Sequence, residues 1–212
     1  MKISDKITHL TKELNHRETG NWTIKRTWLA LNKMDLSEIV QKISKEIKWI
    51  ELSKATLCFG DINGDPVPQW TKHNQLNLID WVLELNVSEK DFDENLLILD
   101  FDILTITESG KKIQFNDVGF VLIDYSQSCL SIIISISLNI FSPKILFFEA
   151  QGDSTIELDL GEQNAINNRE ELRKTLKALK NNLNAEITDW SSDNMNGIEK
   201  YGFSDKTCQY RF

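Results

Sequence analysis

A nearly unbroken alternation of apolar and polar residues in the middle of the chain constrains the fold more than any other feature. Its clearest segment places large aliphatic residues at every second position: Leu130, Ile132, Ile134, Ile136, Leu138 and Ile140. Successive side chains of a β-strand point to opposite faces, so this spacing predicts a strand with one apolar face. A membrane-spanning helix needs about 20 mostly apolar residues. Because serines, an asparagine and then Pro143 interrupt this segment, we expect a strand and no membrane segment.

The same period of two runs through residues 76–160. It predicts strands over residues 81–87, 97–103, 111–115, 118–125, 145–149 and 154–160, after a short strand at 55–59. The connections between them are too short to hold the crossover helices that parallel strands require. The sequence therefore predicts a largely antiparallel, meandering sheet with one face buried and the other exposed to water.

Helical spacing of apolar residues appears on both sides of this region. It predicts helices over residues 2–16, 36–51 and 168–184, and Asp35 followed by Glu38 forms a capping-box pattern at the start of the second helix. Residues 20–34 fit neither period. The C-terminal tail holds five aromatic residues that we expect to pack on the domain: Trp190, Tyr201, Phe203, Tyr210 and Phe212.

These elements predict an α+β fold in a single domain over residues 1–212. Its N-terminal part (about 1–54) is expected to be helical, and the sheet to occupy about residues 55–160. A C-terminal helix packed on the sheet is expected to begin the last part (about 165–212), and the tail to complete it.

Negative charge is concentrated in the middle of the chain. The formal net charge is −8, but residues 55–165 hold 18 Asp and Glu against 5 Lys and Arg, a net of −13. Contact with nucleic-acid phosphates needs clustered Lys and Arg, so this block argues against nucleic-acid binding. It favours a basic protein partner, although an acidic surface also serves solubility alone.

Cysteine usage and the first residues indicate a cytoplasmic protein. Cys58, Cys129 and Cys208 lie far apart and form no Cys-x-x-Cys pair, a pattern that fits neither a disulfide framework nor a zinc site. The first six residues carry three charges, where a signal peptide needs an apolar run to follow its start.

The segment Gly60-Asp61-Ile62-Asn63-Gly64-Asp65 places oxygen donors at alternate positions, as calcium-binding loops do. It resembles the acidic loops of calcium-binding β-propeller repeats, but it occurs once and a propeller needs many copies. An EF-hand would need Gly and Glu at the positions of Pro66 and Lys72. A turn at Asn63-Gly64 accounts for the same residues, and a metal site at Asp61, Asn63 and Asp65 is the alternative.

The run Leu99-Asp100-Phe101-Asp102 resembles the first motif of haloacid-dehalogenase phosphatases. That resemblance implies a nucleophilic Asp, an acid/base Asp and magnesium on a parallel sheet with crossover helices. The family pattern continues with Gly and Thr, where this chain has Ile103 and Leu104. The pair is also similar to the metal-binding Asp-x-Asp of nucleotide-sugar glycosyltransferases. Because strand follows strand here, we interpret Asp100 and Asp102 as carboxylates on the solvent face of a half-buried strand.

No other segment carries a catalytic or cofactor-binding fingerprint. The sequence has no Walker loop, no Gly-x-Gly-x-x-Gly, no Gly-x-Ser-x-Gly and no His-Glu-x-x-His. His9, His16 and His73 lack the spacing of metal ligands. We therefore predict no catalytic residues, no metal and no cofactor, and favour a protein that is not an enzyme.

An acidic surface is the functional feature that remains. If the predicted strands are neighbours, six carboxylates share one polar sheet face: Asp80, Glu84, Asp100, Asp102, Glu157 and Asp159. Like charges on one face repel, and a partner rich in Lys and Arg would offset that repulsion. We expect a cytoplasmic module that binds a basic protein there, as bacterial immunity proteins bind their toxins. The alternatives are a metal-dependent hydrolase or transferase that uses Asp100 and Asp102, and a scaffold that binds through basic N-terminal helices.

Overall fold

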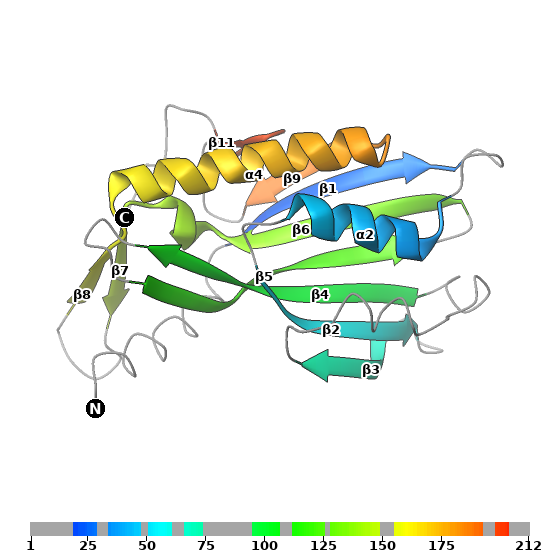
Figure 1. The fold of residues 1–212 in the computed structure, drawn as a ribbon, viewed down its shortest axis with the longest axis horizontal. Helices are drawn as coiled ribbons and strands as arrows, with labels where there is room; N and C mark the ends of the chain where they lie inside the picture. Colours follow the sequence, from blue (N-terminus) through cyan, green and yellow to red (C-terminus); the bar gives the residue numbers. More distant parts are fainter. Residues whose placement is uncertain are drawn as a thin grey trace.

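A computed structural model of the chain describes residues 19–28, 34–47, 51–60, 66–73, 95–106, 112–125, 128–148, 155–192 and 198–203. In it, two helices cover one face of a seven-stranded antiparallel sheet (Figure 1). The α+β class and the antiparallel sheet predicted from the sequence are confirmed. No helix in these ranges is long and apolar enough to cross a membrane.

The strand order of the large sheet is β3-β2-β4-β5-β6-β1-β9. Its strands are β1 (Thr19–Thr27), β2 (Glu51–Gly60), β3 (Pro66–His73), β4 (Asn95–Ile106), β5 (Lys112–Tyr125), β6 (Cys129–Ser137) and β9 (Glu186–Ser192). Two small sheets pair β7 (Lys144–Phe148) with β8 (Thr155–Asp159), and β10 (Ile198–Glu199) with β11 (Gly202–Phe203). The helices are α2 (Leu36–Glu46), α4 (Glu162–Asn182) and the short 3-10 helix η2 (Leu138–Phe141).

The sheet extends further along the chain than the sequence predicts. Only β4, β5 and β6 follow one another as the expected meander, because β4 pairs with β2 and not with β3. Strands β1 and β9, from the two flanks of the chain, complete the sheet beyond β6. The predicted helical N-terminal part is therefore supported only in part, since α2 forms there but β1 is a strand. The limit of the sheet to about residues 55–160 is wrong. Trp22 and Ile24 of β1 are fully buried and alternate with half-buried polar residues, but the apolar residues from Trp28 onward obscure this short period in the sequence.

The helices α2 and α4 were both predicted, with different ends, whereas η2 occupies positions that the alternation through Leu138 and Ile140 predicted as strand. The helix predicted over 36–51 stops at Glu46, because the chain from Glu51 onward pairs in β2. The Asp35 side chain makes no capping hydrogen bond, and its backbone carbonyl accepts the N–H of Ile39 instead (3.0 Å). The helix predicted over 168–184 is α4, which begins at Glu162. The helix predicted over 2–16 and the strand over 81–87 lie outside the described residues.

Two further strand predictions are corrected by the pairing. The strands predicted at 111–115 and 118–125 are one strand, β5, whose register against β4 shifts between Phe101 and Ile103. The strands predicted at 145–149 and 154–160 do form, as β7 and β8, but they pair only with each other within the described part of the chain.

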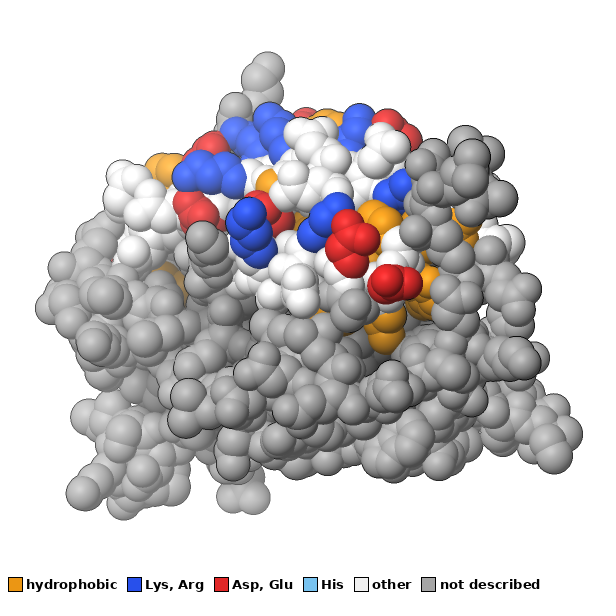
Figure 2. Space-filling model, turned by 45° about the vertical axis from the view of Figure 1, so that its right-hand side comes forward, with side chains coloured by type: hydrophobic (Ala, Val, Ile, Leu, Met, Phe, Trp, Pro, Cys, Tyr) orange, Lys and Arg blue, Asp and Glu red, His pale blue; other side chains and the backbone are white. Residues whose placement is uncertain are grey.

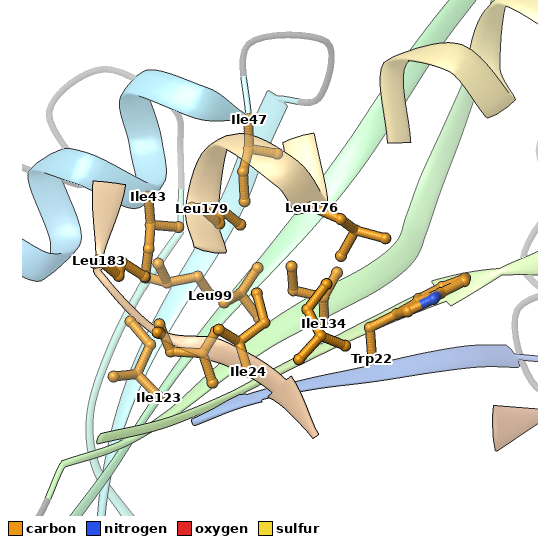
Figure 3. Packing of buried hydrophobic residues seen from close by; sticks show 14 of the residues in the cluster. Trp22, Ile24, Ile43, Ile47, Leu99, Ile123, Ile134, Leu176, Leu179 and Leu183 are labelled. Atoms are coloured by element: carbon orange, nitrogen blue, oxygen red, sulfur yellow. The ribbon is translucent and has the colours of Figure 1, made fainter. Parts of the chain in front are cut away.

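The core lies between the helices and one face of the large sheet (Figure 3). Side chains from the two helices and the residues at their C-terminal ends point toward the sheet: Ile43, Ile47, Leu176, Leu179 and Leu183. They meet apolar side chains from four strands: Trp22, Ile24, Leu99, Ile123 and Ile134. Full burial of one such aliphatic side chain contributes about 1.5–3 kcal/mol, so this layer holds α2 and α4 to the sheet.

The second sheet face is less exposed than the alternation predicts. On β6, Ser131 and Ser135 point away from the helices, yet they are only 8% and 2% exposed. Ile133, between them on the same face, is half-buried, as is its neighbour Leu122 on β5. The expectation of one wet face is therefore wrong at the centre of the sheet.

Arg26 connects β1 to the end of α4 and to the start of α2. Its Nη1 donates hydrogen bonds to the backbone carbonyl of Leu183 (2.7 Å), just after α4, and to the sulfur of Met34 (2.9 Å), just before α2. Its guanidinium lies over the ring of Trp28, 5.1 Å from the centroid. A cation is favoured at the C-terminal end of a helix, where unpaired carbonyls gather.

Candidate functional site

The structure separates the carboxylates that the sequence predicts to share one face. Asp100 and Asp102 lie two positions apart in β4, an inner strand of the large sheet. Glu157 and Asp159 belong to β8, in a different sheet. Asp80 and Glu84 lie outside the described residues. The single acidic sheet face expected from the alternation is therefore not formed by these four residues.

Asp100 is a half-buried carboxylate on the sheet face away from the helices. Its neighbour Leu99 points into the core, so alternation directs Asp100 to the second face. In the ladder, Lys54 of β2 and Phe120 of β5 occupy the positions opposite it.

The phosphatase resemblance also implied a parallel sheet around this pair. The strand that holds Asp100 and Asp102 is antiparallel to both of its neighbours, β2 and β5. The parallel strands that the phosphatase motif requires are therefore not found around this pair, in agreement with the antiparallel sheet predicted from the sequence.

Asp159 is exposed and has a structural partner. One carboxylate oxygen accepts a hydrogen bond from the backbone N–H of Gly161 (2.9 Å), where the chain turns from β8 into α4. Gly161 has a φ of 82°, a conformation that side chains other than glycine rarely adopt. This local bond fixes the entry to α4 and leaves the rest of the Asp159 carboxylate at the surface.

Asp124 is an acidic residue that the sequence analysis did not single out. Across β5, β6, β1 and β9, successive facing positions are Asp124, Ser131, Lys25 and Glu186. Burial raises the pKa of the Asp124 carboxyl, while the charge of Lys25 lowers it. The row holds a negative, a neutral, a positive and a negative side chain on four strands. Sequence reasoning missed it because its four residues come from separate segments of the chain.

Strand β9 is the edge of the described sheet next to β1. Five of its seven residues are exposed: Glu186, Thr188, Asp189, Trp190 and Ser191. The prediction that tail aromatics pack on the domain is wrong for Trp190, which is 40% exposed. Phe203 does pack, with its ring centroid 4.7 Å from that of Phe141 and 6.0 Å from that of Trp22. Tyr210 and Phe212 lie outside the described residues.

The helical layer presents charges of both signs. In Figure 2, Lys and Arg side chains alternate with Asp and Glu over the layer formed by α2 and α4. Several of them are paired along the helices: Lys42 with Glu38 (2.9 Å), Arg173 with Glu170 (2.6 Å) and Lys174 with Glu171 (2.6 Å). Such exposed pairs contribute little to stability, and they place opposite charges side by side on these helices.

In the parts of the chain that the structure describes, no group of three or more His, Cys, Asp or Glu is placed to hold a metal ion. Asp61, Asn63 and Asp65 lie outside those parts.

No protein-family model matches the chain, and neither a curated protein nor a solved structure is significantly similar to it. Its own charges and exposed surfaces are therefore what bears on function.

Proposed function

We propose that the protein is a non-enzymatic, cytoplasmic binding module that engages a basic protein partner through an acidic surface. The supporting observation is the net charge of −13 over residues 55–165. Such a concentration of negative charge attracts a positively charged partner and speeds their encounter at low salt. The proposed contacts are the carboxylates Asp80, Glu84, Asp100, Asp102, Glu157 and Asp159.

The partner class that fits this charge best is a toxin with a basic cleft, neutralised as bacterial immunity proteins neutralise theirs. A nuclease binds phosphates with Lys and Arg, and carboxylates of a protein inhibitor can occupy the same positions. Asp100 and Asp102 in the large sheet and Asp159 in the β7–β8 sheet then supply separate contacts.

Affinity capture tests this proposal. The full chain is immobilised, exposed to a lysate of its source organism at low salt and washed at high salt, and released proteins are identified by mass spectrometry. One stoichiometric basic protein released by salt is expected. A bait with Asp100→Asn and Asp102→Asn should retain less of it than a bait with Glu38→Gln and Glu162→Gln, which has the same net charge. Equal retention by both baits, or no retained protein, would contradict the proposal.

A metal-dependent hydrolase or transferase is the second candidate, favoured by the Asp-x-Asp pair in an inner strand. It predicts that Mg²⁺, Mn²⁺ or Ca²⁺ raises the thermal midpoint, because a ligand that binds only the folded state stabilises it. The gain should disappear when Asp100 and Asp102 are both replaced by Asn. An unchanged midpoint with all three ions eliminates this candidate.

A further inference from the structure

We propose that β9 is a docking edge, which binds an extended basic segment of the partner by strand addition to the large sheet. This inference rests on the proposed function for the basic character of the partner. An edge strand leaves backbone N–H and C=O groups on its outer side, and an added strand can pair with them. β9 is the last strand of the described sheet, and β1 pairs with its inner side.

Side chains of β9 are exposed on both faces of the sheet, so a partner can reach this edge strand from either side. Asp189 lies opposite Thr23 and Trp190 lies opposite Trp22, so the two side chains belong to opposite faces. Both are exposed, as is Ser191. Trp190 is 40% exposed, whereas Trp22 beside it is fully buried. The short strand β10 contacts β9 but leaves these residues accessible.

The two edges of the described sheet differ in their capacity to add a strand. The opposite edge, β3, contains Pro66 and Pro68, which have no N–H to donate and so block strand addition. β9 has the sequence EITDWSS, with no proline and no basic residue. Its pairing with β1 is irregular between Thr23 and Ile24 and regular from Asp189 to Ser192. The regular part of β9 is thus the part suited to pair with a partner.

The charge of β9 favours a basic strand over a second copy of the chain. A second copy would bring the same acidic edge and the same net charge of −8, and like charges across a strand pair are destabilising. Glu186 is already held by Lys180 (3.1 Å) and Lys200 (3.8 Å), which leaves Asp189 as the selecting charge. An added strand with Lys or Arg on the Asp189 face and an apolar residue or Arg on the Trp190 face satisfies both side chains.

Selection from random ten-residue peptides displayed on phage tests this assignment with the full chain as target. The enriched peptides should be rich in Lys and Arg. Asp189→Lys and Trp190→Ser should each weaken their binding by about tenfold or more, as expected for a central charge and an aromatic anchor. The matched controls Glu162→Lys and Ile166→Ser change an exposed acid and a 42% exposed aliphatic residue on α4, and should bind as wild type. Circular dichroism verifies that each variant is folded.

Hydrogen exchange then locates the bound peptide. We expect amide exchange to slow within β9 and to stay unchanged in the other strands of the sheet. Four results would each overturn the assignment. Selection could enrich no peptide, or Asp189→Lys could bind the peptides as well as Glu162→Lys does. The peptide could protect another strand, or the chain could form a dimer joined at β9. A captured basic partner that leaves β9 exchange unchanged overturns the docking edge alone. Peptide protection at β9 without a captured basic protein overturns the proposed function alone.

Discussion

Replacing Arg26 by Met should destabilise the protein more than the loss of one surface charge. The guanidinium of Arg26 joins three parts of the fold, since it donates to the Leu183 carbonyl after α4 (2.7 Å), donates to Met34 before α2 (2.9 Å) and lies over Trp28. Methionine keeps much of the aliphatic contact but loses the charge and every donor. The substitution therefore isolates the polar part of this connection.

The magnitude follows from those contacts. A hydrogen bond from a charged group contributes about 1.5–3 kcal/mol, and a cation over an aromatic ring about 0.5–1 kcal/mol at an exposed site. Because water can replace part of the lost bond at the helix end, we expect a loss of about 2–3 kcal/mol in the free energy of unfolding. With a urea m-value of roughly 2–3 kcal/mol/M, the unfolding midpoint should fall by about 1 M.

Equilibrium urea unfolding, followed by tryptophan fluorescence and circular dichroism, measures this loss. Arg26→Lys should fall between wild type and Arg26→Met, because it keeps the charge but not the planar fork of donors. Lys174→Met is the control: this lysine side chain is 67% exposed and pairs along α4 with Glu171, so its unfolding midpoint should stay close to that of wild type. A loss for Arg26→Met no larger than for Lys174→Met would refute the reasoning.

Three further predictions use the same unfolding assay or hydrogen exchange. Leu179→Ala, at a fully buried position on α4, should cost about 2–5 kcal/mol; a loss under about 1 kcal/mol would contradict its place in the core. Trp22→Phe removes the indole N–H that donates to the Glu199 carbonyl (3.0 Å), so exchange in β10 and β11 should accelerate before exchange in β1, and uniform acceleration would argue against this role. Burial raises the folded-state pKa of Asp124 despite the nearby charge of Lys25, so the folded chain binds this proton more tightly and the associated stability is lost as pH rises through that pKa. Asp124→Asn should therefore stabilise the protein at pH 7, with a gain that shrinks toward acidic pH; a gain that grows there would contradict the assignment.

The elements with strong local periodicity were predictable from the sequence. The alternation from Leu130 to Ile136 predicted β6, and the spacing of Leu172, Leu176 and Leu179 predicted α4. Each period places the apolar residues on one face of only one kind of element, a strand or a helix. The start of α4 was not predictable in this way, since its first turns are polar and depend on the bond between Asp159 and Gly161.

Pairings between distant segments left no such local signal. Thr23 and Asp189 face one another across β1 and β9, yet β9 holds only two large apolar residues and is read from the sequence as a polar tail. Strand order also decides which acidic residues are neighbours, and alternation does not reveal strand order. Because β8 lies outside the large sheet, its acidic residues do not join Asp100 and Asp102 on one face.

The position of β1 also changes how the scaffold alternative can be tested. Deletion of residues 1–54 would remove a strand that lies between β6 and β9, along with the buried side chains of Trp22 and Ile24. We expect the remainder not to fold, so loss of binding after this deletion would not identify a binding surface. Charge substitutions on the folded chain, such as Lys42→Gln and Lys45→Gln on α2, examine the same region without removing the strand.

The salt dependence of association tests the central claim most directly. The rate constant for binding the captured partner is measured by stopped flow from about 50 to 500 mM NaCl, for wild type and for the variant with Asp100→Asn and Asp102→Asn. An acidic surface that steers a basic partner predicts a rate that falls steeply with salt, with a lower rate and a shallower slope for the variant. An association rate that is the same at every salt concentration would contradict the account.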